Sequence, residues 1–121
     1  MVRLAIKEAK KSKHRHKLGA VLLKGSRIYA RGHNVPCKHV SRSLVPMRYR
    51  VYPTSLHAEV AAVLALERSP KGLWLVVVRI GHNDELRDSY PCPKCLGYLK
   101  AVGIRRVIYT TNSGEVLHQI L

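Results

Sequence analysis

Two apolar segments dominate the pattern of hydrophobic and polar positions along the chain. Residues 54–68 are rich in alanine, leucine and valine, and they predict a helix that is apolar over most of its surface and therefore buried. Thr54 or Ser55 is the expected cap of this helix, because a hydroxyl oxygen can accept a hydrogen bond from a free amide of the first turn. Residues 73–80 form a continuous apolar run, which is typical of a central strand.

Shorter elements precede these two segments. Residues 2–11 have the spacing of an amphipathic helix, with an apolar face formed by Leu4, Ala5, Ile6 and Ala9. Two strands joined by a tight turn follow as a hairpin, with predicted ranges 20–23, 24–26 and 27–32. Residues 35–53 show no periodicity, and a loop of this length in a compact domain is usually functional or mobile.

The C-terminal third of the chain predicts one helix and two strands. Residues 93–102 form the helix, which Gly103 ends, and residues 105–111 and 116–121 form the strands. The turn at residues 112–114 leaves no room for a helix, so the last two strands should be antiparallel neighbours.

Length and composition limit the kind of protein. The 121 residues are expected to form one domain over 1–121, without a membrane-spanning segment or the apolar core of a signal peptide. Three cysteines, two of which are predicted metal ligands, suit a reducing compartment. We therefore expect a cytoplasmic protein, with the nucleus or a virus particle as open alternatives.

Two polar residues stand out at the start of the buried helix. His57 and Glu59 would cost free energy in an apolar setting unless a site there uses them. Downstream, residues 91–95 read Pro-Cys-Pro-Lys-Cys, with Cys92 and Cys95 at the start of the next helix. His-x-Glu followed by Pro-Cys-x-x-Cys is the signature of zinc-dependent deaminases.

The chemistry of zinc explains these residue types. Zinc takes four tetrahedral nitrogen or sulfur ligands, and a catalytic site leaves one of the four positions to water. His57, Cys92 and Cys95 supply three ligands, and zinc lowers the pKa of water towards neutrality. We expect Glu59 to take a proton from this water, pass it to the ring nitrogen and then protonate the leaving ammonia.

Other interpretations of the motif have to be weighed. A lone Cys-x-x-Cys also occurs in structural zinc sites and redox pairs, and Cys37 or another histidine could then supply a fourth ligand. His57 could be a satisfied core histidine, and Cys37 an incidental free cysteine. The joint spacing, both prolines and the helical setting favour a catalytic site.

Several segments together resemble the cytidine deaminase-like superfamily, in particular the cytidine and deoxycytidylate deaminase zinc-binding region. The similarity runs from about residue 18 to residue 111 and rests on segments 19–23, 32–34, 56–59, 91–95 and 103–109. The resemblance implies a three-layer α/β fold in which helices flank a mixed five-stranded sheet. It also implies that zinc lies between the starts of two helices.

The resemblance also suggests substrate contacts. It implies that Asn34 contacts the substrate sugar, although a plain turn residue is the alternative, and it makes Ala58 a second substrate-binding candidate. A direct turn between the last two strands resembles free-nucleoside deaminases and some toxin deaminases. The tRNA adenosine and AID/APOBEC-type enzymes place a helix there, so the chain departs from them and cytosine is the expected base.

Charge is distributed unevenly along the chain. The formal net charge is +15, and residues 1–50 hold 14 of the 22 lysines and arginines but a single acid. Such a concentration favours polyanions, and the resemblance puts these segments around the active-site mouth. The predicted phosphate contacts are Arg48 and Arg50, and loop tyrosines that could stack bases are Tyr49, Tyr52 and Tyr90. The alternatives are a solvated basic face and tyrosines that simply pack.

These observations predict a zinc-dependent hydrolytic deaminase that converts cytosine to uracil. The charge favours single-stranded nucleic acid as the substrate. The terminal hairpin favours the alternative, a free nucleoside or nucleotide such as dCMP. A non-catalytic nucleic-acid-binding zinc protein is a remote alternative, because a structural site does not need Glu59. The oligomeric state, including a homo-oligomer, stays open.

Overall fold

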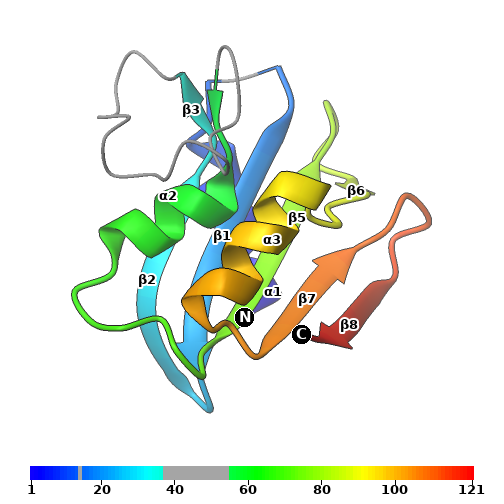
Figure 1. Ribbon diagram of the computed structural model, residues 1–121. Helices are drawn as coiled ribbons and strands as arrows, with labels where there is room; N and C mark the ends of the chain where they lie inside the picture. The colour runs from blue at the N-terminus through cyan, green and yellow to red at the C-terminus, as the bar shows by residue number, and fades with distance from the viewer. Residues whose placement is uncertain (14, 37–54) are drawn as a thin grey trace.

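A mixed sheet runs through the centre of the molecule (Figure 1). The computed structural model describes residues 1–13, 15–36 and 55–121. Five strands form the main path of the sheet in the order β2-β1-β5-β7-β8. Their bounds are β1 Lys17–Lys24, β2 Arg27–His33, β5 Trp74–Ile80, β7 Arg106–Thr110 and β8 Val116–Ile120.

The pairing of the strands confirms the predicted topology. β1 pairs antiparallel with both β2 and β5, β5 pairs parallel with β7, and β7 pairs antiparallel with β8. The sheet is therefore mixed and ends in an antiparallel hairpin. A sixth short strand, β6 (Leu86–Arg87), folds back on the end of β5.

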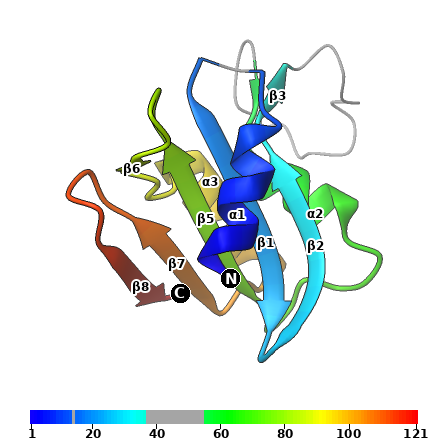
Figure 2. The same cartoon turned by 180° about the vertical axis from the view of Figure 1, so that it is seen from behind.

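Helices cover both faces of the sheet, as the three-layer fold requires. In Figure 1, α2 (Ala58–Ala65) and α3 (Pro93–Val102) lie in front of the sheet, and Figure 2 shows α1 (Val2–Lys10) on the opposite face. Alternate residues of the central strands point to the two sides, which places the two largest of the three apolar clusters on opposite faces of the sheet. One cluster contains Leu22 and Val77, and the other contains Val21 and Val76.

Two glycines allow helices to approach the sheet closely. A Cβ atom on Gly19 would lie 2.1 Å from the carbonyl oxygen of Ala5 in α1. A Cβ atom on Gly32 would lie 2.3 Å from the backbone nitrogen of Ala62 in α2. Both helices therefore pack against strand backbone, and α2 takes its position from β2.

The start of α2 differs from the sequence-based prediction. The helix begins at Ala58 with His57 as its N-cap, so the prediction of a cap at Thr54 or Ser55 is wrong. Ser55–Leu56 forms β4, which pairs antiparallel with β3 (Val35–Pro36). This ladder keeps the backbone extended up to His57, whose ψ of 153° is also extended. The helix ends at Ala65, before the predicted Arg68.

The other elements agree well with their predicted ranges. α3 has the predicted bounds, and Gly103 ends it with a left-handed φ of 92°. β1 begins at Lys17, three residues earlier than predicted, because its pairing with β5 extends to Ile80. Within the described residues, no helix has the length and apolar character needed to cross a membrane.

Candidate active site

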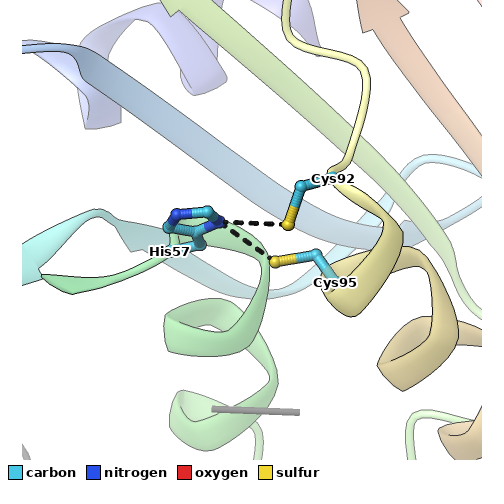
Figure 3. Close-up of side chains that lie close together, drawn as sticks. All are labelled: His57, Cys92 and Cys95. Atoms are coloured by element: carbon cyan, nitrogen blue, oxygen red, sulfur yellow. Dashed lines mark hydrogen bonds between the residues drawn. The ribbon is translucent and has the colours of Figure 1, made fainter. Parts of the chain in front are cut away.

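Two helix starts supply the side chains of the site. His57 is the N-cap of α2, and Cys92 is the N-cap of α3, with Pro93 in the first turn. Neither N-cap side chain forms a capping hydrogen bond with its own helix. Cys95, one turn into α3, is fully buried. Figure 3 shows the three side chains converging from the two helices.

The spacing of these atoms fits a zinc ion. His57 Nδ1 lies 3.1 Å from Cys95 Sγ and 3.7 Å from Cys92 Sγ. Tetrahedral ligands at usual zinc distances would place nitrogen and sulfur about 3.5 Å apart. The three ligand atoms all lie within 4.8 Å of one another, and no other described His, Cys, Asp or Glu residues form such a group. One nitrogen and two sulfurs are the donor set of a catalytic zinc site.

Burial dominates the electrostatics at Cys95. Burial raises the pKa of the Cys95 thiol, and the nearby Glu59 and Cys92 raise it further. A bound divalent cation reverses this balance, because a coordinating thiol loses its proton.

Glu59 lies two residues after His57, in the first turn of α2. Its side chain is only 2% exposed, and its Oε1 atom has no hydrogen-bond partner among the described residues. Burial raises the pKa of Glu59 to about 7, against the opposing effects of a backbone hydrogen bond and one from Cys95. A buried carboxylate oxygen without a partner is costly in a purely structural role.

A hollow of about 260 Å³ opens over these residues. His57, Glu59 and Cys92 line it, together with His16, Leu18, Asn34, Arg79, Asp88, Ser89 and Tyr90. Two of the three candidate ligands and the carboxylate thus border one cavity from two helix starts, and Cys95 is buried beside it. A small ligand in this cavity would contact both the metal site and Glu59.

Comparison with known proteins decides the assignment. A family model described as the cytidine and deoxycytidylate deaminase zinc-binding region matches residues 1–111. The chain belongs to this family. His57, Cys92 and Cys95 are the zinc site of this family member.

Solved deaminase structures share the fold. The apo dCMP deaminase from the cyanophage S-TIM5 is 23% identical with a TM-score of 0.58, and the match covers 92% of this chain and 82% of that chain. The same enzyme in complex with dCMP and dUMP is 22% identical with a TM-score of 0.54, over 88% and 77% of the two chains. A cytidine deaminase from Burkholderia pseudomallei is 22% identical with a TM-score of 0.63, over 99% and 92%. A search of curated proteins gave no match.

Asn34 borders the hollow of the deaminase but also has a structural role. Its side-chain oxygen accepts a hydrogen bond from the backbone N–H of Leu18 at 3.0 Å, and its amide NH₂ donates to the backbone oxygen of His16. The side chain is 3% exposed. An amide has two donor hydrogens and two acceptor lone pairs, so one of each remains for a ligand.

The other predicted contacts divide into two groups. Ala58 is fully buried and its side chain packs in the core, so only its backbone could contact a ligand. Tyr90 borders the hollow and is 40% exposed. The remaining sequence-based candidates lie outside the described residues, and these are Cys37, Arg48, Tyr49, Arg50 and Tyr52.

Sequence reasoning missed a buried polar group behind Cys92. Ser89 Oγ donates to the backbone oxygen of Val77 at 2.7 Å and accepts from the backbone N–H of Thr110 at 2.7 Å. The Thr110 hydroxyl donates to the backbone oxygen of Arg87 at 2.6 Å. These bonds tie the segment before Cys92 to the ends of β5 and β7. A serine three residues before Cys92 was the only local signal.

Sequence reasoning also missed the side wall of the hollow. Arg79, from the end of β5, lies with its guanidinium NH2 nitrogen 2.9 Å from His16 Nδ1. These two residues are 63 positions apart in the chain, and nothing local to either predicts the contact.

Proposed function

We propose that the chain catalyses the hydrolytic deamination of cytosine to uracil, in a nucleoside or a nucleotide. The observation that carries this proposal is Glu59, which borders the same hollow as the ligands His57 and Cys92 and whose buried Oε1 has no hydrogen-bond partner among the described residues. A structural zinc site has no need for such a carboxylate. Its raised pKa, about 7, suits a group that must both accept and release a proton near neutral pH.

The reaction adds water to the ring and releases ammonia. Zinc, held by His57, Cys92 and Cys95, would supply the Lewis acid that makes water a nucleophile at neutral pH. Glu59 accepts a proton from the attacking water and transfers it to ring nitrogen N3. Glu59 then delivers a second proton from the added hydroxyl group to the exocyclic amine, which leaves as ammonia. The products are uracil and ammonia, and Glu59 regains its starting state.

Two further residues are assigned to substrate binding under this proposal. Asn34 offers one amide hydrogen and one lone pair towards the hollow, which suits a sugar hydroxyl. The backbone of Ala58 lies between His57 and Glu59 at the first turn of α2, where a free amide can donate to the base. The shared fold with dCMP and cytidine deaminases supports a pyrimidine nucleoside or nucleotide in this hollow.

Single-stranded nucleic acid is the second candidate substrate. The observation in its favour is the concentration of 14 lysines and arginines in residues 1–50. Cationic surfaces of this kind bind phosphate backbones without sequence preference. Arg48, Arg50, Tyr49 and Tyr52 remain its sequence-based contact residues.

One assay tests the proposal. Zinc-loaded protein is incubated with cytidine, dCMP and a cytosine-containing oligonucleotide in parallel, and ammonia and uracil are measured. Uracil formed from at least one of the three supports the proposal, and the relative kcat/KM values identify the substrate. Glu59→Ala is the matched control, and it should retain zinc but form no uracil above background. Zinc-loaded, folded protein that forms no uracil from any of the three substrates would refute the proposal.

A further inference from the structure

A second hollow adjoins the catalytic one. It has a volume of about 430 Å³ and shares His16 and Arg79 with the catalytic hollow. Its other walls come from the segment before β1, from the hairpin between β5 and β6, and from Asn112. In Figure 1, this hairpin lies at the end of β5, where the chain turns back into β6. We call this second cavity the basic hollow.

Positive charge distinguishes the basic hollow. Arg15, Lys17, Arg79 and Arg87 line it, and Glu85 is its one carboxylate. Within the described part of the chain, Arg15, Lys17 and Arg79 have no ion-pair partner. Four cations around one cavity repel one another, and a bound anion would relieve this repulsion.

The single carboxylate does not neutralise the cavity. Glu85 accepts a hydrogen bond from the backbone N–H of Asn83 at 3.0 Å and lies 3.4 Å from Arg87 Nε. Both partners belong to its own hairpin, where the carboxylate also covers the backbone of Gly81. Glu85 therefore offsets one charge and shapes the hairpin, and an excess of positive charge remains for a ligand.

The shared wall links this charge to the reaction. Arg79 contacts His16, and Asn34 bonds to the backbone of His16 and Leu18, so the segment between the two hollows is fixed from both sides. A cytosine base placed at Glu59 would direct its sugar past Asn34 and this wall. The next chemical group of a nucleotide is a phosphate, and guanidinium groups bind phosphate well.

We propose that the basic hollow binds a phosphate group of the substrate while the base occupies the catalytic hollow. This inference rests on the proposed function, and it makes the preferred substrate an anion rather than a free nucleoside. The phosphate is either the monoester of a free nucleotide or the phosphodiester of a single strand. The residues assigned to it are Arg15, Lys17, Arg79 and Arg87.

Binding probes without cytosine test this inference separately from catalysis. The probes are dUMP, an oligothymidylate without a terminal phosphate, and deoxyuridine, which has no phosphate. Their Kd values are measured with the zinc-loaded protein and with Arg15→Gln/Arg87→Gln. We expect binding of dUMP, of the oligothymidylate or of both to weaken about tenfold or more in the variant, because charged hydrogen bonds are lost. If only dUMP binds more weakly to the variant, the basic hollow binds a phosphate monoester. If only the oligothymidylate binds more weakly, it binds a phosphodiester.

Matched variants separate a charge effect from a folding effect. Lys24→Gln/Lys100→Gln removes two exposed charges outside the basic hollow, and it should bind both phosphate probes like the wild type. Arg15→Lys/Arg87→Lys keeps the charge and should restore most of the binding. The wild-type chain itself should bind the affected phosphate probe more weakly as salt rises, because bound phosphate displaces counterions.

Three results would overturn the inference. The first is an equal effect of the two glutamine double variants on the phosphate probes. The second is an equal loss for deoxyuridine and the phosphate probes. The third is phosphate-probe binding by the wild-type chain that does not change with salt. None of the probes contains cytosine, so none can be deaminated. The binding results therefore test the phosphate site separately from the proposed deaminase activity.

Discussion

The two neighbouring hollows share a wall but differ in construction. The catalytic hollow is built from two helix starts, where Glu59 is 2% exposed and the neighbouring Cys95 is fully buried. The basic hollow uses mostly exposed side chains from separate segments, including Arg15, Lys17 and Arg87. Burial raises the pKa of Glu59 in the first cavity and of Cys95 beside it, whereas the second cavity depends mainly on how many charges surround it.

Under these proposals, the catalytic hollow determines whether the reaction occurs, and the basic hollow determines which substrates are preferred. Loss of one buried group should abolish the reaction for every substrate, because no neighbouring group can replace it. Loss of one surface charge should weaken only substrates that carry phosphate, and by a graded amount. Variants in the two hollows should therefore be distinguishable by how their effects depend on substrate charge.

The largest expected effect comes from the carboxylate. Glu59→Gln keeps the size of the side chain but cannot accept a proton, so kcat/KM should fall by about 10²–10⁴-fold or more. The loss should be the same factor for cytidine and dCMP, and zinc content should not change. Steady-state kinetics and metal analysis measure both. A variant that retains more than about a tenth of the rate would exclude Glu59 as the proton carrier, since acid–base contributions are larger than this.

The next effect concerns the metal. Cys92→Ala removes a ligand, so zinc affinity should fall by more than about 100-fold. That figure is the largest loss typical of replacing a residue that only hydrogen-bonds to a metal ligand. Thermal unfolding should move to lower temperature, because the ligands connect the starts of α2 and α3. Lys94→Ala, between the two cysteines and exposed, is the matched control and should keep its zinc. Full zinc occupancy and full activity in Cys92→Ala after dialysis would contradict the ligand assignment.

A smaller effect is expected on the salt dependence of oligonucleotide binding, and it distinguishes two sets of basic residues. For an oligonucleotide, the slope of log Kd against log salt should decrease by up to roughly two units when two phosphate contacts are removed. The sequence favours Arg48 and Arg50 for these contacts, and the basic hollow favours Arg15 and Arg87. The two double glutamine variants are compared in the same titration. An unchanged slope in either pair removes that pair from the nucleic-acid contacts.

The smallest expected effect is a change in stability, and it comes from Ser89 in the wall of the catalytic hollow. Ser89→Ala leaves the Val77 carbonyl and the Thr110 amide without their hydroxyl partner, which should lower the free energy of unfolding by about 1–3 kcal/mol. Urea denaturation measures this change. Ser113→Ala, an exposed turn residue, should shift stability far less. If the two variants are equally stable, the Ser89 network does not fix the segment before Cys92.

Local sequence signals predicted most of the fold. Proline and glycine at the two ends of α3 gave its bounds, and the short turn at 112–114 gave the antiparallel hairpin of β7 and β8. The start of α2 was predicted too early, because hydroxyl residues at 54 and 55 resemble a cap. The pairing of β3 with β4 overrides that signal, and such a contact between distant segments leaves no local trace.

The zinc site could be predicted because its residues are close together in sequence, whereas the basic hollow could not, because its residues come from distant segments. His57 and Glu59 occupy one helix start and Cys92 and Cys95 another, so their spacing in sequence fixes their geometry. Arg79 interrupts an apolar strand and gives no sign of its contact with His16. Only the antiparallel pairing of β1 with β5 brings those two segments together.

The contact at Gly32 has a consequence for the precision of the molecule. Helix α2 rests there on peptide backbone, so no side-chain rotamer can adjust the distance between helix and sheet. Elsewhere in the core, a changed side chain can be accommodated by repacking. An added methyl group at Gly32 would have to displace the backbone at Ala62 by about 1 Å, and a shift of that size in a reacting group can reduce a rate about 100-fold. The close backbone contact at Gly32 thus limits where α2, and with it His57 and Glu59, can lie relative to the sheet.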